Sequence, residues 1–262
     1  MDKYVVYCGT RNVYDTMVVA AKSLLCHNIV DKIFFFIEDD NFPNPLPSVI
    51  ECINVSNQTW FPASHSMWTY MANMRFVVGK ILNHIDSILY LDTDTLVLGD
   101  ISEVFNTNLT GKLFAMVQED LNDITIEFLN CFGVYNNTLY RVLSDAARPE
   151  YPIHPYFNSG VMFINVSEMK NTGMDDILVH EVNNSNHPYP DQDAINLTCH
   201  DKIVPLPTNY NVIPALLPDF PHEQIRIKHY ASDKPLWKSS LWQSYKRMSW
   251  ESIMERQAKL IG

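Results

Sequence analysis

The stretch ILYLDTDTLVLGDI (residues 88–101) begins as an apolar run and then presents two carboxylates, Asp92 and Asp94, one residue apart. The apolar run predicts a buried strand, which places the carboxylates at its carboxyl end. Residues i and i+2 project to the same side of an extended backbone, so the two carboxylates are expected to converge on one ligand. Hard cations such as Mn²⁺ and Mg²⁺ prefer oxygen ligands and keep positions open for phosphates. The alternative to metal binding is that both aspartates are turn residues, since Thr93 and Thr95 would also suit a turn.

The rest of the chain alternates apolar runs with helical patterns, which is typical of α/β proteins. Strands are predicted over residues 4–9, 32–38, 48–55, 88–91, 113–119, 160–166, 202–206 and 225–230. Helices are predicted over residues 14–26 and 67–82. No internal repeat or low-complexity linker interrupts the pattern, so one domain is expected, with a second half richer in loops.

The bulk composition narrows the class of ligand. The 262 residues are 47% hydrophobic, which allows a substantial core, and the formal net charge is −11. An acidic chain argues against nucleic acid as a partner, and an anionic substrate would need a local cation from side chains or a metal. Five scattered cysteines indicate neither a disulfide framework nor a zinc site. Because no secretory signal or membrane-spanning run is found either, a cytoplasmic protein is expected.

Glycine-rich phosphate loops are missing from this sequence. Only eight glycines are present, and no predicted strand is followed by a GxGxxG or GxxxxGK[ST] sequence. A phosphorylated nucleotide would therefore be held in another way. A divalent ion between its phosphates and the carboxylates of Asp92 and Asp94 is the arrangement that the sequence favours.

The stretch LYLDTDTLVLGDI resembles the metal-binding signature of glycosyltransferase family 8, the retaining enzymes that include glycogenin and bacterial lipopolysaccharide galactosyltransferases. Five further stretches are similar to motifs of that family and follow its order: CGTRNVY (8–14), WTYMANMRF (68–76), PYFNSGVMFINV (155–166), PDQDAIN (190–196) and KHYASDKPLW (228–237). The resemblance implies an α/β fold of the GT-A nucleotide-sugar transferase type, with a mostly parallel mixed sheet flanked by helices. The catalytic domain would cover residues 1–240, and a C-terminal helical tail residues 241–262.

The resemblance also implies the contacts of a UDP-sugar donor and its metal. Asp92, Asp94 and His229 would hold Mn²⁺, with Mg²⁺ as the alternative, and a neutral imidazole suits such an ion beside two carboxylates. Lys234 and Arg75 would stabilise the diphosphate. The remaining residues expected to bind the nucleotide are Thr10, Asn12, Tyr14 and Thr93.

The transferred sugar would lie between two other motifs. In PYFNSGVMFINV, Gly160 permits close backbone approach and Asn158 offers both a donor and an acceptor to sugar hydroxyls. Asp191 and Gln192 open a predicted helix, in which the structural alternative for Asp191 is a helix cap. The family implies retention of configuration. Double displacement would need a carboxylate nucleophile, for which Asp191 and Asp120 are candidates, and front-side attack beside the Gln192 amide is the alternative.

The predicted function is therefore a metal-dependent retaining transfer of glucose or galactose from a UDP-sugar to a glycan, lipid-linked or protein acceptor. Two alternatives remain open. A haloacid-dehalogenase-type phosphatase would use Asp92 as nucleophile and Asp94 as acid/base, but it would carry this motif near the start of its fold. A catalytically inactive nucleotide-sugar-binding protein would keep the fold alone, and Asn73, which stands where the family usually has tyrosine, is compatible with it.

The C-terminal tail admits two interpretations. Its tryptophans lie among lysines and arginines, and a basic helix of this kind would lie on an anionic membrane, at the inner surface where a lipid-linked acceptor is found. In the other interpretation, Trp242 and Tyr245 pack on the catalytic domain while the charges remain solvated.

Overall fold

The computed structural model describes residues 2–43, 45–62, 70–119, 155–184, 189–231 and 236–261. Its main sheet has seven strands in the order β3-β2-β1-β4-β7-β6-β8. In that order their bounds are Ile50–Asn54, Lys32–Ile37, Tyr4–Cys8, Ser87–Leu91, Phe157–Asn165, Phe114–Gln118 and Ile203–Leu206. Neighbouring strands are parallel except for the two pairs made by β7, which is antiparallel to β4 and β6. The predicted mostly parallel mixed sheet is confirmed.

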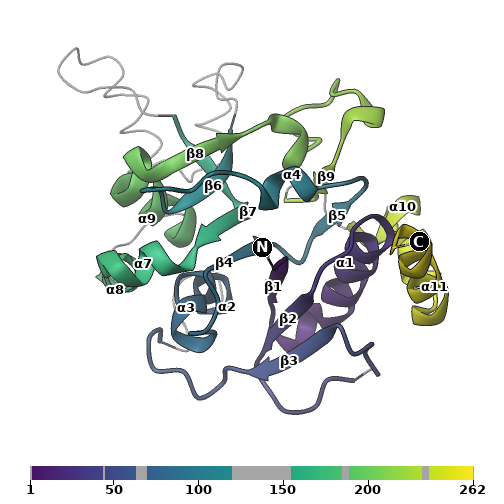
Figure 1. Ribbon diagram of the computed structural model, residues 1–262, viewed down its shortest axis with the longest axis horizontal. Helices are drawn as coiled ribbons and strands as arrows, with labels where there is room; N and C mark the ends of the chain where they lie inside the picture. Colours follow the sequence, from purple (N-terminus) through teal and green to yellow (C-terminus); the bar gives the residue numbers. More distant parts are fainter. Residues whose placement is uncertain are drawn as a thin grey trace.

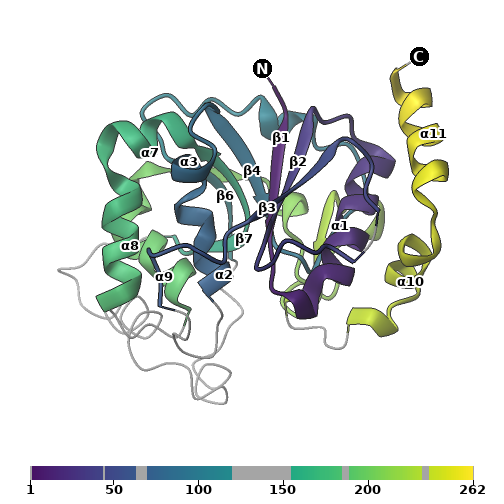
Figure 2. The same ribbon diagram turned by 90° about the horizontal axis from the view of Figure 1, so that it is seen from below.

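Helices cover both faces of this sheet (Figures 1 and 2). One face carries α1 (Tyr14–His27), with α10 (Ser240–Arg247) and α11 (Trp250–Ile261) packed outside it. The other carries α2 (Tyr70–Asn73), α3 (Val78–Ile81), α7 (Val166–Thr172), α8 (Met174–Asn184) and α9 (Pro190–Cys199). Alternate residues of β1 accordingly enter two separate apolar clusters, Val5 and Tyr7 on the α1 side and Val6 and Cys8 on the other. Strands buried on both faces read as continuous apolar runs, which is why they were recognisable from sequence.

The direction of the strands gathers polar residues at one edge of the sheet. Because β1, β2 and β4 are parallel, their carboxyl ends lie at the same edge. The antiparallel strand β7 brings its amino end to that edge, where Leu91 pairs with Val161. Beside it lies a two-stranded ribbon of β5 (Thr95–Val97) and β9 (Ile227–His229). The remaining short elements are α4 (Ser102–Phe105) and the 3₁₀ turns η1 (Arg11–Val13), η2 (Met74–Phe76), η3 (His200–Lys202), η4 (Thr208–Tyr210), η5 (His222–Gln224) and η6 (Leu236–Lys238).

The long helix predicted over residues 67–82 is wrong in its described part. From residue 70 onward the chain forms α2, η2 and α3 instead of one continuous helix. Residues 73–78 are all buried, and one face of a regular helix cannot bury six consecutive residues. The Arg75 side chain also folds back, and its Nε donates to the carbonyl of Ala72 at 2.6 Å. Contacts on both sides of the segment therefore take precedence over its helical pattern.

The tail helices pack on α1 through buried apolar and polar contacts. Trp242 is 2% exposed and meets the ring of Tyr230 edge-on, with 5.8 Å between ring centroids. Ile253 of α11 is fully buried. Gln257 donates to the carbonyls of Leu25 and Asn28 at the end of α1, where carbonyl groups lack helical partners. None of the described helices combines the length and the apolar character that crossing a bilayer requires.

Truncation of Trp242 tests how strongly this packing stabilises the protein. Trp242→Ala is expected to lower the free energy of unfolding by about 3–5 kcal/mol, because it removes a large side chain from a closed site. Met254→Ala, on the outer side of α11 where Met254 is 36% exposed, is the matched control and should change it by less than about 0.5 kcal/mol. Urea unfolding measures both. Equal, small losses would show that the tail does not depend on this contact.

Candidate active site

The carboxylates of Asp92 and Asp94 lie in a turn that joins β4 to β5. The N–H of Asp92 still donates to the carbonyl of Gly160 at 2.8 Å, as in a continuing strand. The backbone then turns, and both the N–H and the hydroxyl of Thr95 donate to the carbonyl of Asp92. The expectation that an extended backbone aligns the two carboxylates is therefore wrong, and the turn brings them together. Thr93 lies half-buried in this turn.

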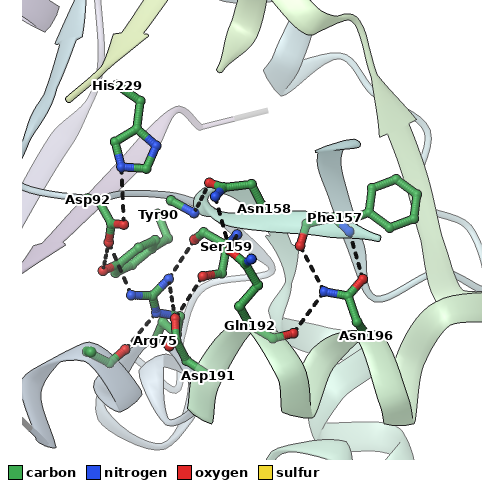
Figure 3. Close-up of polar contacts among 12 residues, drawn as sticks. Arg75, Tyr90, Asp92, Phe157, Asn158, Ser159, Asp191, Gln192, Asn196 and His229 are labelled. Carbon is green, nitrogen blue, oxygen red and sulfur yellow. Dashed lines mark hydrogen bonds and ion pairs between the residues drawn. The ribbon is translucent and has the colours of Figure 1, made fainter. Parts of the chain in front are cut away.

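His229 completes a three-residue cluster with the two aspartates. It ends β9 in register with Thr95, so the ribbon carries its imidazole to the turn. Its Nε2 lies 3.3 Å from Asp94 Oδ1. The same nitrogen lies 3.7 Å from Asp92 Oδ2 (Figure 3). One ligand atom from each residue lies within 4.8 Å of the others. Two carboxylate oxygens and one imidazole nitrogen form a donor set that suits Mn²⁺ and leaves positions open for phosphate oxygens.

Gly160 provides the space in which these side chains meet. A Cβ atom at this position would lie 2.8 Å from His229 Nδ1 and 2.9 Å from Asp92 Oδ2. Any other residue would thus displace the imidazole or the carboxylate. The donor set and the glycine beside it fit a bound divalent cation.

Burial and neighbouring charges shift the pKa of two members of the cluster. Burial raises the pKa of Asp92, the Arg75 guanidinium opposes that rise, and the neighbouring Asp94 adds to it. Burial lowers the pKa of His229, but the carboxylates of Asp94 and Asp92 outweigh burial and raise it overall. The raised pKa of His229 reflects the negative charge of the two carboxylates, which would also attract a metal cation.

Arg75 joins the cluster to the neighbouring helix α9. The guanidinium is 3% exposed, lies 3.1 Å from Asp92 Oδ1 and 3.0 Å from Asp191 Oδ2, and donates to the carbonyl of Ser159 at 2.6 Å. It also stacks over the ring of Tyr90, 4.1 Å from the centroid, while the Tyr90 hydroxyl donates to Asp92 at 2.6 Å. The described contacts of Arg75 are thus with protein groups, and they fix two carboxylates.

A buried group of amides lies beside Arg75 (Figure 3). Asn158 Nδ2 donates to Glu119 Oε1 at 2.8 Å and to Gln192 Oε1 at 3.0 Å. Gln192 Oε1 also accepts the N–H of Ser159 at 3.0 Å. The Ser159 hydroxyl donates to Asp191 at 2.8 Å. The sequence motifs at residues 155–166 and 190–196 therefore form one hydrogen-bonded unit.

The start of α9 differs in one detail from its prediction. The cap position is Tyr189, and Asp191 lies within the first turn with its side chain directed to Arg75 and Ser159, so the cap interpretation of Asp191 is wrong. Asp193 accepts the N–H of Tyr189 at 3.1 Å.

The residues after β1 form contacts of their own. The Tyr14 hydroxyl accepts the N–H of Glu38 at 3.1 Å and lies 3.4 Å from Asp39. Thr10 and Asn12 are half-buried and exposed, respectively, in the turn between β1 and α1. These contacts join the turn to the end of β2, at the same sheet edge as the cluster.

Glu119, Asn211, Tyr90 and Ser159 escaped the sequence analysis, and two predicted residues lie outside the described part of the chain. Glu119 follows β6 directly, so the signal that identified Asp92, a carboxylate after an apolar strand, would have found it. Asn211, whose Oδ1 lies 2.9 Å from His229 Nδ1, stands in a sequence without such a signal. Asp120 and Lys234 lie outside the described residues.

Comparison with known proteins identifies relatives along almost the whole chain. Residues 4–240 match the family model described as Glycosyl transferase family 8. A lipopolysaccharide 1,2-glucosyltransferase of Escherichia coli K12 is 25% identical over 98% of this chain and 81% of that protein.

Solved structures show the same fold. The bifunctional glycosyltransferase WbbM gives a TM-score of 0.74 at 16% identity, covering 98% of this chain and 52% of that one. This chain thus spans about half of WbbM. The galactosyltransferase LgtC, in complex with donor and acceptor sugar analogues, gives a TM-score of 0.61 at 15% identity, covering 98% and 95%. The expected GT-A fold is confirmed.

Replacement of Arg75 tests whether its buried ion pairs hold the site together. Arg75→Met is expected to lower the free energy of unfolding by about 3–5 kcal/mol in metal-free buffer, because it leaves two partly buried carboxylates without their cation. Arg11→Met, which breaks the exposed pair with Asp39, should leave stability unchanged within error. Denaturant unfolding compares the two. A stable Arg75→Met protein would contradict the structural role.

Proposed function

Because the chain belongs to glycosyl transferase family 8, we propose that it is a metal-dependent retaining hexosyltransferase. It would move glucose or galactose from a UDP-sugar to a saccharide, lipid-linked or protein acceptor. The observation that carries the proposal is the cluster of Asp92, Asp94 and His229 at the sheet edge. Family membership argues against the phosphatase alternative, and so does the position of the motif after β4 instead of β1. The E. coli relative is named as a glucosyltransferase and LgtC as a galactosyltransferase, which supports a hexose donor.

Asp92, Asp94 and His229 would hold the divalent cation, Mn²⁺ or Mg²⁺. When bound, that ion supplies charge neutralisation to the diphosphate leaving group. Arg75 contributes by fixing the Asp92 carboxylate and by adding positive charge beneath the site. Lys234 is the proposed direct contact of the diphosphate, as a flexible point charge.

The uridine would bind along the carboxyl ends of β1 and β4. These strands are parallel neighbours, so the turn that carries Thr10, Asn12 and Tyr14 and the turn that carries Thr93 open at the same edge. Backbone and hydroxyl groups there can satisfy the polar edge of a base.

The sugar would lie against the amide group formed by Asn158 and Gln192. The Gln192 amide is the proposed neighbour of the anomeric carbon, and Gly160 leaves room for the His229 and Asp92 side chains beside the sugar. The carboxylate of Asp191 accepts a hydrogen bond from Ser159 and pairs with Arg75. These contacts suit a structural role for Asp191 more than a role as nucleophile. This arrangement favours front-side attack over double displacement through Asp191.

We also propose a division into a catalytic domain over residues 1–240 and a tail over residues 241–262. The buried Trp242 and Ile253 hold the tail on α1. At its far end, Leu260 and Ile261 are exposed beside Lys259. That end would meet the inner surface of an anionic membrane, where a cytoplasmic enzyme finds a lipid-linked acceptor.

Metal dependence is tested by removing one charged ligand at a time. Asp92→Asn and Asp94→Asn are expected to lower Mn²⁺-stimulated transfer and UDP-sugar hydrolysis by about 10²-fold or more, while the fold stays intact. Asp100→Asn is the matched control, since this exposed carboxylate lies outside the cluster and accepts hydrogen bonds from the N–H and the hydroxyl of Ser102. Undiminished activity in the presence of a chelator, or in either variant, would contradict the proposed metal dependence. UDP-sugar binding without turnover in the wild type would point to an inactive binding protein.

Gln192 and His229 should separate turnover from nucleotide binding. Gln192→Ala is expected to lower kcat by about 10²-fold or more with little change in the inhibition constant of UDP, since its amide acts at the sugar. His229→Ala should instead weaken UDP and Mn²⁺ binding together. Steady-state kinetics with UDP inhibition measures both variants. An equal loss of UDP affinity in Gln192→Ala and His229→Ala would contradict the placement of Gln192 at the anomeric carbon.

A further inference from the structure

The tautomer of His229 decides whether the cluster is ready for a cation. A neutral imidazole carries one proton, on either Nδ1 or Nε2, and only the unprotonated nitrogen can ligate. Nε2 is the nitrogen that faces Asp92 and Asp94. The proton therefore has to reside on Nδ1, and a hydrogen-bond acceptor opposite Nδ1 would keep it there.

Asn211 lies at that position. Its Oδ1 is 2.9 Å from His229 Nδ1, and the Asn211 side chain is buried. The backbone fixes this placement, because Val212 N–H donates to the carbonyl of Ile227 at 2.9 Å and His229 N–H donates to the carbonyl of Val212 at 2.8 Å. The segment after η4 is thus paired with β9, and Asn211 cannot shift away from the imidazole without breaking that pairing.

The orientation of the Asn211 amide follows from groups that can only donate. The N–H of Ser159 donates to Gln192 Oε1, which identifies that atom as the oxygen. The Asn158 atom that faces Gln192 Oε1 must therefore be its nitrogen, and its oxygen accepts the N–H of Gly160 at 2.9 Å. Asn211 approaches this same oxygen of Asn158 at 2.7 Å and must present its own nitrogen. Its oxygen is then left to face His229 Nδ1.

We infer that Asn211 is a positioning residue: its Oδ1 accepts the Nδ1–H of His229 and so presents an unprotonated Nε2 to the two aspartates. The inference rests on the proposed function for its purpose, although not for its geometry. Through Asn158 the same chain of amides connects the imidazole with Gln192. Asn158 and Gln192, which are proposed to contact the sugar, thus help to fix the tautomer of His229, which is proposed to ligate the ion.

The tautomer is observable without any ion. Protein labelled with ¹⁵N in histidine, in metal-free buffer at a pH where His229 is neutral, gives long-range ¹H–¹⁵N correlations that distinguish the protonated from the unprotonated ring nitrogen. The His229→Gln spectrum assigns the signal. In the neutral ring two sets of acceptors compete for the proton: Asn211 Oδ1 holds it on Nδ1, and the carboxylates of Asp94 and Asp92 draw it to Nε2. We expect the Nδ1–H form in the wild type, because the 2.9 Å contact with Asn211 is shorter than the contacts of 3.3 Å and 3.7 Å with the carboxylates. In Asn211→Leu, which removes the acceptor opposite Nδ1, we expect a shift toward the Nε2–H form. Asn211→Asp, which keeps an oxygen opposite Nδ1, should retain the Nδ1–H form.

Asn209→Leu is the matched control, because Asn209 lies on the same segment and its Oδ1 has no hydrogen-bond partner among the described residues. It should keep the wild-type tautomer. Calorimetric titration with Mn²⁺ in the presence of UDP should show affinity lowered by about 10–100-fold in Asn211→Leu, as for other groups that orient a metal-ligating histidine, and unchanged in Asn209→Leu. Should Asn211→Leu fail to fold, Asn211→Ala decides the same question.

The two measurements separate this inference from the proposed function. An Nε2–H form in the wild type, or an unchanged Nδ1–H form in folded Asn211→Leu or Asn211→Ala, would overturn the role of Asn211, even if Asp92→Asn abolished metal binding. A wild type with the Nδ1–H form that failed to bind Mn²⁺ with UDP would overturn the proposed function, while the tautomer shift in Asn211→Leu would still support the hydrogen bond.

Discussion

The buried guanidinium of Arg75 is the constraint on which the rest of the site depends. A charge with this little exposure is tolerated only when it is paired and hydrogen-bonded. Its partners come from three separate parts of the chain: Asp92 after β4, Ser159 in β7 and Asp191 in α9. Because one planar group must satisfy all three, the end of β4, the start of β7 and the first turn of α9 have little freedom relative to one another.

Much of the fold could be predicted from the sequence because its strands are buried on both faces. Runs such as YVVYC and KIFFFI need no partner to be recognised, and both became strands within a residue or two of their predicted bounds. The carboxylates after β4 were also visible as candidates, because the whole stretch LYLDTDTLVLGDI resembles the metal-binding signature of the family. The prediction that they lie together with His229 agrees with the structure, although their assignment to a metal stays a prediction.

The remaining features depend on contacts between distant residues. The segment 70–82 has a helical pattern, yet its burial between the sheet and α8 breaks it into three short pieces. Asp92 and Asp94 converge in a turn that leads into β5, and the pairing partner of β5, β9, comes late in the chain. No local sequence pattern identifies Asn211, because its role depends on the hydrogen-bond donors and acceptors that surround it in the folded protein. Donor and acceptor accounting of this kind requires coordinates.

The ribbon of β5 and β9 determines when the cluster can exist. β5 follows Asp94 almost at once, whereas β9 is made only after all seven strands of the main sheet. During synthesis the two aspartates and Arg75 therefore emerge long before His229, and the closing contact spans a large sequence separation, which folds slowly. A nascent chain stopped before β9 would contain every strand of the main sheet but an incomplete cluster. Competence to capture an ion would thus be acquired only after every strand of the main sheet and β9 have been made.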